Sequence, residues 1–195
     1  MKLPIVAYGD PVLRKVAEEI DEDYPNLKEL IENMFETMYG ANGVGLAAPQ
    51  IGLPIRLFVV DGSPFGEDDE DGPGDPTVKG FKKAFINPII VEESGEKWAF
   101  NEGCLSIPDI QEDVLRHKNI LINYLDENFE EHEEELTGLA ARIVQHEYDH
   151  IEGKLFVDKI GPLKKALLKS KLDNIAKGQI RVGYKMKFPL QKKGR

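Results

Sequence analysis

Gln145-His146-Glu147-Tyr148-Asp149-His150 lies in a helix that the sequence predicts from Thr137 to Glu152. Thr137 can cap the start of this helix, and Gly153 can stop it. Two histidines four residues apart share one face of a helix, so both imidazoles can reach the same metal ion. The glutamate beside the first histidine stands where a general base would act on a metal-bound water. The stretch therefore predicts a metal centre built on a helix.

The two histidines continue an apolar stripe along the same helix. Leu139 and Ile143 precede them on one face, at steps of four and three residues. The alternative is a surface helix whose histidines are merely solvated. Polar side chains that continue a buried apolar face, however, lose contact with water and need partners inside the protein. We therefore expect His146 and His150 to face the interior of the molecule.

A third metal ligand is not obvious downstream of the helix. Glu152 is too close to His150, and Asp158 lies in a new segment. The better candidate is Cys104, which follows a predicted strand. A thiolate and two imidazoles leave the fourth position open, as in catalytic metal sites. Two alternatives remain: Cys104 is inert core, or a structural zinc site takes His117 or Asp149 as its fourth ligand.

A glycine-rich loop, Gly43-Val44-Gly45-Leu46-Ala47-Ala48-Pro49-Gln50, follows the first predicted helix. Its small residues allow close approach to another group. The amide of Gln50 is a hydrogen-bond donor that could face a substrate. Sequence spacing alone does not place Gln50 in the site, because a glutamine in a surface turn would look the same.

The rest of the chain mixes helices and strands. An amphipathic helix is predicted over Asn26–Met38 and closed by Gly40, and a second from Pro162 to about residue 177. The apolar stripe of the second comprises Leu163, Leu167, Leu168, Leu172 and Ile175. Strands are predicted over Ile55–Val60, Phe85–Val91, Lys97–Phe100, Ile120–Leu125 and Phe129–Leu136.

The last two of these strands form a predicted hairpin. Its second strand is so acidic that it must lie at an edge or on the surface. The pattern as a whole predicts an α+β fold. We expect a single compact domain of mostly antiparallel sheets around a central metal-binding helix, with a C-terminal helix.

Two stretches lie outside these elements. Residues 61–80 are rich in Asp, Glu, Gly and Pro and predict an acidic surface loop. Calcium binding there is conceivable, but the EF-hand spacing is absent. Residues 178–195 form a basic tail, of which Lys185–Arg195 is expected to be frayed.

Charge is unevenly distributed along the 195 residues. Residues 163–195 hold nine Lys and two Arg against one Asp, a net charge of +10, so residues 1–162 carry −20 of the total of −10. The acidic body argues against general nucleic-acid binding by that part of the chain, whereas the basic end suits an anionic partner or simply solvated charge. A single cysteine, no membrane span and no leader-like start predict a cytoplasmic protein.

Three segments together resemble one family, the peptide deformylases. The glycine loop ending in glutamine corresponds to Gly43–Gln50, the Glu-Gly-Cys-Leu-Ser segment to Glu102–Ser106, and the Gln-His-Glu-x-Asp-His helix to Gln145–His150. All three match without a gap and in the family's order. The resemblance extends from about Pro4 to about Leu172, which implies a catalytic domain over residues 1–177.

The resemblance implies a hydrolase that removes the formyl group from the N-terminal formyl-methionine of new polypeptides. The implied metal ligands are Cys104, His146 and His150. Glu147 is the implied general acid and base, acting with a metal-bound hydroxide that attacks the formyl carbon. Gln50 and the Leu105 backbone N–H are the implied donors to the oxyanion.

The resemblance also assigns residues to the substrate. The pocket for the methionine side chain is implied at Val44, Leu105, Leu139 and Ile143. Gly45 would offer backbone hydrogen bonds to the peptide, and Glu102 and Arg116 would form a supporting ion pair.

The implied cofactor is one divalent metal ion, with Fe²⁺ favoured and Zn²⁺, Ni²⁺ or Co²⁺ as substitutes. Thiolate and imidazole ligands suit Fe²⁺ and Zn²⁺ alike. The rival function is that of another zinc peptidase using the same helix pattern. Expected partners are N-formylmethionyl peptides and, through the basic C-terminal helix, the ribosome, whose surface is largely RNA phosphate. Neither a membrane nor DNA is an expected partner.

Overall fold

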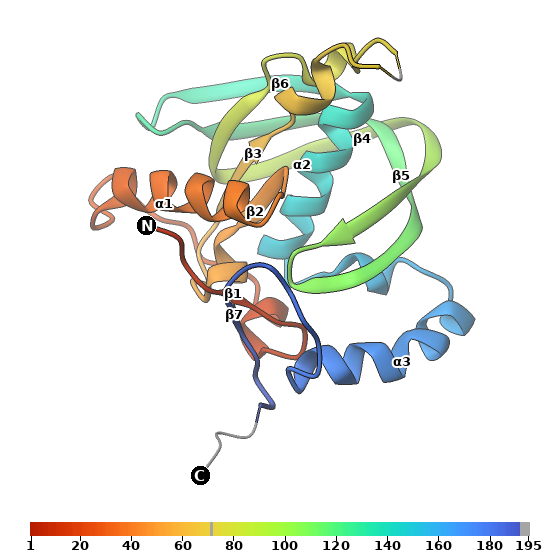
Figure 1. Cartoon of the computed structure of the whole chain (residues 1–195). Helices are drawn as coiled ribbons and strands as arrows, with labels where there is room; N and C mark the ends of the chain where they lie inside the picture. The colour runs from red at the N-terminus through yellow and green to blue at the C-terminus, as the bar shows by residue number, and fades with distance from the viewer. Residues whose placement is uncertain (71, 192–195) are drawn as a thin grey trace.

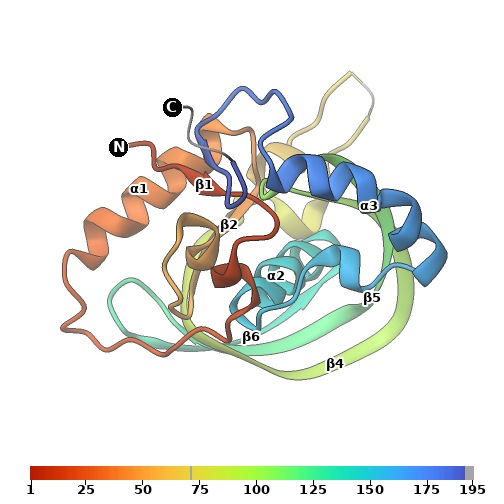
Figure 2. The ribbon, with the colours of Figure 1, turned by 90° about the horizontal axis from the view of Figure 1, so that it is seen from below.

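The helix α2 (Gly138–Ile151) is buried along ten of its 14 residues and runs through the middle of the fold. The computed structural model describes residues 1–70 and 72–191. Strands wrap around α2 on several sides, which is clearest when the molecule is seen from below (Figure 2). Because both faces of this helix meet protein, its polar side chains must find partners inside.

One antiparallel sheet of five strands forms most of this wrapping, in the order β2-β3-β4-β5-β6. Its strands are β2 (Gly45–Ala47), β3 (Leu57–Asp61), β4 (Lys82–Cys104), β5 (Ile107–Leu125) and β6 (Glu131–Thr137). The register between β4 and β5 shifts at four places along their length. Such bulges bend and twist a strand pair, and β4 and β5 curve around α2 accordingly (Figures 1 and 2).

Two further helices and a small parallel sheet surround this core. The helices are α1 (Leu27–Gly40) and α3 (Pro162–Ala176), and the small sheet pairs β1 (Ile5–Val6) with β7 (Met186–Lys187). Short 3₁₀ turns are η1 (Pro11–Arg14), η2 (Ala48–Ile51), η3 (Ser63–Gly66), η4 (Pro76–Val78) and η5 (Phe156–Asp158). Across residues 1–70 and 72–191, no helix is both long and apolar enough to span a membrane.

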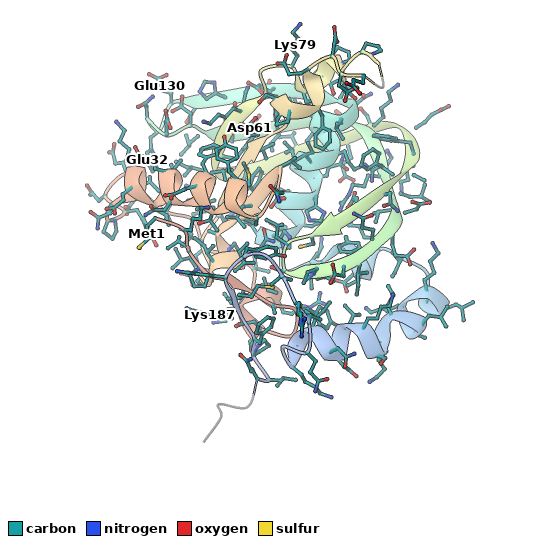
Figure 3. The ribbon with its side chains drawn as sticks, in the orientation of Figure 1. Met1, Glu32, Asp61, Lys79, Glu130 and Lys187 are labelled. Carbon is teal, nitrogen blue, oxygen red and sulfur yellow. The ribbon has the colours of Figure 1, made fainter. Side chains whose placement is uncertain are left out.

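The α+β prediction is confirmed, with α1, β3 and α2 close to their expected places. The acidic strand β6 lies at the edge of the sheet, as its charge requires. Figure 3 shows Glu130 at the tip of the β5–β6 hairpin, away from α2. The side chain of Glu130 is exposed there.

The two strands predicted between Phe85 and Phe100 are wrong as separate elements, because β4 is continuous from Lys82 to Cys104. The polar stretch between them contains Gly95 with φ of 76° at one of the register shifts. In the sequence, a glycine at a bulge within a polar stretch cannot be distinguished from a turn between two strands. The loop predicted over residues 43–50 is also partly regular, since it contains β2 and most of η2.

The predicted cap of α2 is occupied by a different side chain. Thr137 stands at the cap position but makes no side-chain capping bond, because its hydroxyl donates to Asn119 Oδ1 at 2.7 Å. Instead, Thr77 Oγ1 accepts from the Ala140 backbone N–H at 3.3 Å. The acidic loop thus supplies the cap from its far end, beside the fully buried Val78.

The apolar stripe predicted on α3 is only half correct. Leu172 and Ile175 are buried, but Leu163 and Leu167 are each 74% exposed. Only the second half of α3 therefore packs on the body. The expected fraying from Lys185 is wrong at β7, whose two residues pair with β1. The remainder of that expectation at residues 192–195 lies outside the described residues, as does residue 71 of the acidic loop.

Phe85 is the aromatic centre of the core that covers α2. It is fully buried and stacks on Phe58 with ring centroids 4.8 Å apart, and it contacts the tilted ring of Tyr124 at 4.4 Å. We predict that Phe85→Ala lowers the free energy of unfolding by about 3–5 kcal/mol, measured by urea denaturation. The control is Val91→Ala, at a side chain 55% exposed, which should change it by less than about 0.5 kcal/mol. Equal effects of the two variants would contradict this packing.

Candidate active site

Three side chains that could hold a metal ion meet where the end of β4 touches α2. Cys104 Sγ lies 3.3 Å from His150 Nε2, and the ligand atoms of Cys104, His146 and His150 all lie within 4.8 Å of one another. Ligand atoms around one tetrahedral metal ion stand roughly 3.5 Å apart, given bonds of about 2.0–2.3 Å. The three side chains therefore fit a single divalent ion with one position left for another ligand.

Neither candidate for a fourth protein ligand joins this group within the described residues. His117 Nδ1 bonds the Gly95 carbonyl at 2.9 Å, on the exposed side of the sheet. Asp149 Oδ2 instead accepts from Arg116 Nη1 at 2.7 Å. The arrangement differs from a closed structural zinc site, which needs four protein ligands.

A buried carboxylate, Glu102, orients the first histidine. Its Oε2 lies 3.0 Å from His146 Nδ1, and two hydrogen bonds of 2.7 and 3.0 Å join it to Arg116. Burial alone would raise the pKa of Glu102, but bonds from His146 and Arg116 outweigh it and hold that pKa well below its usual range. The ionised carboxylate can only accept, so His146 Nδ1 carries a proton and Nε2 is free to bind metal.

A second arginine, Arg142, also holds this carboxylate. Its Nη1 donates to Glu102 Oε1 at 2.9 Å and to the Val114 carbonyl at 2.9 Å. Its guanidinium carbon lies 4.6 Å from the Trp98 ring centroid. The resemblance implied the Glu102–Arg116 pair, which the structure contains, but not Arg142. Arg142 and His146 are four residues apart on the helix and so share one face. This spacing was the sequence signal that could have predicted Arg142 beside the site.

Glu147 is buried beside the ligands and points toward the glycine loop. Only 4% of it is exposed, and its Oε2 has no hydrogen-bond partner among the described residues. Burial raises the pKa of this carboxyl to about 7. A Cβ at position 45 would overlap Glu147 Oε1, so any other residue there would displace the carboxylate. The absence of a side chain at Gly45 therefore leaves room for the Glu147 carboxylate.

A backbone hydrogen bond anchors Gln50, and its amide group faces Cys104. Its Oε1 accepts from the Ala47 N–H at 2.9 Å, which leaves Nε2 facing Cys104 Sγ at 3.4 Å and Ser106 Oγ at 3.3 Å. The structure thus places Gln50 beside Leu105, which lies in the turn between β4 and β5. Sequence spacing could not place it, because 54 residues separate Gln50 from Cys104.

Cys104, His146, Glu147 and Gln50 line a cavity of about 900 Å³. The walls include the four residues implied for the side-chain pocket, Val44, Leu105, Leu139 and Ile143, and also Gly45. Sequence reasoning missed several other lining residues: Phe65, Phe100, Arg142, Arg181 and Tyr184. Tyr184 and Arg181 come from the segment after α3, where no pattern distinguished them.

Comparison with known proteins identifies the family. A model of the family described as polypeptide deformylase matches residues 2–166. The chain is 61% identical to the peptide deformylase of Christiangramia forsetii over 196 residues, covering both chains completely. This chain belongs to the peptide deformylase family. The family membership confirms the resemblance and rules out the rival zinc peptidase.

Two further relatives agree. The peptide deformylase of Flavobacterium johnsoniae is 61% identical over 197 residues, again covering both chains completely. The crystal structure of the Legionella pneumophila peptide deformylase superposes with a TM-score of 0.77 at 38% identity, covering 93% of this chain and 99% of that one. The protein is therefore an enzyme, a hydrolase that deformylates new polypeptides, and its family implies a metal ion.

We predict that Gly45→Ala abolishes most of the deformylase activity without unfolding the protein. The added methyl group would push the Glu147 carboxylate from its place, and a displacement of about 1 Å can cost roughly a hundredfold in rate. The measurement is kcat on formyl-Met-Ala-Ser, with thermal unfolding as a check on the fold. Gly161→Ala is the control, because nothing lies within 4 Å of the Cβ added there. A Gly45→Ala enzyme with normal kcat would show that this close approach does not matter.

Proposed function

We propose that Cys104, His146 and His150 hold the metal ion of this deformylase and that Glu147, Gln50 and Leu105 act on the formyl group. The supporting observation is that Cys104, His146 and His150 cluster together and that all of the named residues except His150 line one cavity. They come from three segments far apart in the chain. Among the described residues, Glu147 Oε2 has no hydrogen-bond partner although it is buried, which is typical of a functional carboxylate.

The cofactor in this proposal is one divalent ion, with Fe²⁺ as the working metal and Zn²⁺, Ni²⁺ or Co²⁺ as substitutes. When bound, such an ion lowers the pKa of water to about 7 and polarises a carbonyl oxygen. The donor set suits Fe²⁺ and Zn²⁺ alike, so the preference for iron rests on the family resemblance. Metal analysis of protein purified without oxygen tests this choice.

Glu147 moves the proton in the proposed reaction. Its carboxylate takes a proton from the attacking water and passes it to the amine that leaves. Because burial raises its pKa to about 7, a base role requires deprotonation near neutral pH. The activity should therefore rise as the pH increases through this range.

Gln50 Nε2 and the Leu105 backbone N–H stabilise the negative charge that grows on the formyl oxygen. Donors fixed before the reaction stabilise such charge without reorganising. The Ala47–Gln50 bond fixes the first donor, and the β4–β5 turn presents the second. The apolar walls at Val44, Leu139 and Ile143 would take the methionine side chain, and the Gly45 backbone would bond the peptide.

We also propose that the enzyme works in the cytoplasm and reaches its substrate at the ribosome. New formylated chains are made there, and a lone cysteine suits a reducing compartment. The basic polar face of α3 is the proposed contact with ribosomal RNA. In this proposal residues 1–177 form the catalytic domain and residues 178–195 form a basic C-terminal extension, part of which folds back onto that domain through β7.

Glu147→Ala provides the direct test of the proposed chemistry. The variant should retain its metal and its fold but lose about 10²–10⁴-fold in kcat on formyl-Met-Ala-Ser. Metal content and circular dichroism are measured on the same samples. Turnover within a few-fold of the wild type would remove Glu147 from the mechanism.

The ribosome proposal has its own test. Changing Lys164, Lys165, Lys169 and Lys171 to Glu should abolish co-sedimentation with ribosomes at low salt and leave activity on a short peptide intact. Three of these lysines form only surface ion pairs, with Glu112, Asp158 and Asp173, so stability should change little.

A control with the same change of charge uses exposed lysines of the body: Lys79, Lys97, Lys118 and Lys154. This second variant should co-sediment nearly as well as the wild type. Equal loss in both variants would mean that net charge alone, and not α3, governs the association.

A further inference from the structure

The segment between α3 and β7 returns to the active-site cavity. Arg181, Val182, Gly183 and Tyr184 line that cavity, although they lie beyond residues 2–166 matched by the family model. The small sheet fixes this segment directly after Tyr184. The Lys185 carbonyl accepts from the Ile5 N–H at 2.9 Å, and the Lys187 carbonyl accepts from the Ala7 N–H at 2.8 Å. Lys187 marks this strand in Figure 3.

Tyr184 reaches from this segment to the turn that holds the catalytic groups. Its hydroxyl donates to the Leu105 backbone carbonyl at 2.8 Å. Its ring packs, partly buried, against the same core cluster as the Leu105 side chain. Burial raises the pKa of the phenol, so the hydroxyl keeps its proton and remains a donor.

The next carbonyl of the turn is held from the other end of the chain. The Tyr8 backbone N–H donates to the Ser106 carbonyl at 2.8 Å. Tyr8 follows β1, and Tyr184 precedes β7, so the pairing of the two strands joins both contacts into one support. Two successive carbonyls, those of Leu105 and Ser106, are thus fixed by the two ends of the chain.

We propose that Tyr184 is a positioning residue, which holds Leu105 so that its backbone N–H points at the developing oxyanion. This inference rests on the proposed role of the Leu105 N–H. Only the two dihedral angles of Leu105 separate its N–H from its carbonyl. A bond that fixes the carbonyl therefore restricts the direction of the N–H, and Tyr184 supplies it without touching the substrate's formyl group.

The expected effect is on the rate and not on substrate binding. Removing an oxyanion donor costs about 10²–10³ in kcat, and a donor that is present but misdirected should cost less. We expect Tyr184→Phe to lower kcat on formyl-Met-Ala-Ser by about 5–30-fold, with KM within twofold of the wild type. A loss confined to stability would lower the amount of active enzyme without changing kcat per folded molecule.

The experiment compares Tyr184→Phe with Tyr24→Phe, in the full-length, metal-loaded enzyme. Tyr24 packs against the same core cluster but lies outside the cavity lining, so its variant controls for a lost hydroxyl. Three quantities are measured: kcat and KM, the melting temperature, and hydrogen exchange of the backbone amides at Cys104–Ser106. Tyr184→Phe should speed exchange at this turn and lower kcat, whereas Tyr24→Phe should change neither.

Two results would overturn the inference, and they have different meanings. Unchanged exchange at Cys104–Ser106 would show that the Tyr184 hydroxyl does not hold the turn. Faster exchange with kcat within twofold of the wild type would show that the turn is held but that its Leu105 N–H does not stabilise the oxyanion. The second result would also count against the proposed role of Leu105, which the first would leave intact.

Discussion

The buried carboxylate of Glu102 links β4 to β5 and to the central helix α2. It sits near the end of β4, two residues before Cys104, and it bonds Arg116 on β5 and both Arg142 and His146 on α2. A charge buried this deeply is costly to leave unpaired, by about 3–5 kcal/mol when one partner is removed. The ionic cluster therefore specifies how the sheet and the central helix lie against each other, and it sets the proton on His146 at the same time.

A close contact between the glycine loop and a neighbouring face of α2 completes the site. The glycine loop brings Gly45 against Glu147 and turns the amide of Gln50 toward Cys104. Neither contact tolerates much movement, because the first leaves no room for a methyl group and the second depends on the Ala47–Gln50 bond. The two ends of the chain then hold the β4–β5 turn at its carbonyls. The glycine loop and the two ends of the chain, which are far apart in the sequence, thus hold the residues of one site in place.

Local patterns predicted much of this arrangement. The step between His146 and His150 and the stripe before them indicated an inward metal-binding face. The residues themselves also marked Cys104 as a third ligand and Gln50 as a possible donor, whereas the role of Leu105 came only from the resemblance. Features that depend on tertiary packing could not be predicted from the sequence. The length of β4 was hidden by a glycine at a bulge, Gly95, and the cap of α2 came from Thr77, 60 residues before the helix was predicted to begin.

Two errors show where sequence reasoning fails in this chain. The stripe on α3 was expected to pack throughout, but periodicity cannot show how far a helix extends beyond the body, and Leu163 stays exposed. Tyr184 was placed in a basic tail, because its role depends on the pairing of β7 with a strand 181 residues earlier in the chain.

X-ray absorption spectroscopy of the protein loaded with one equivalent of Zn²⁺ tests the metal centre most directly. We expect one sulfur neighbour at about 2.3 Å and two imidazole nitrogens at about 2.0–2.1 Å, with a light atom in the remaining position. The sulfur should disappear in Cys104→Ser. A wild-type spectrum with no sulfur neighbour, or one that Cys104→Ser leaves unchanged, would contradict the assignment of Cys104 and with it the metal site described above.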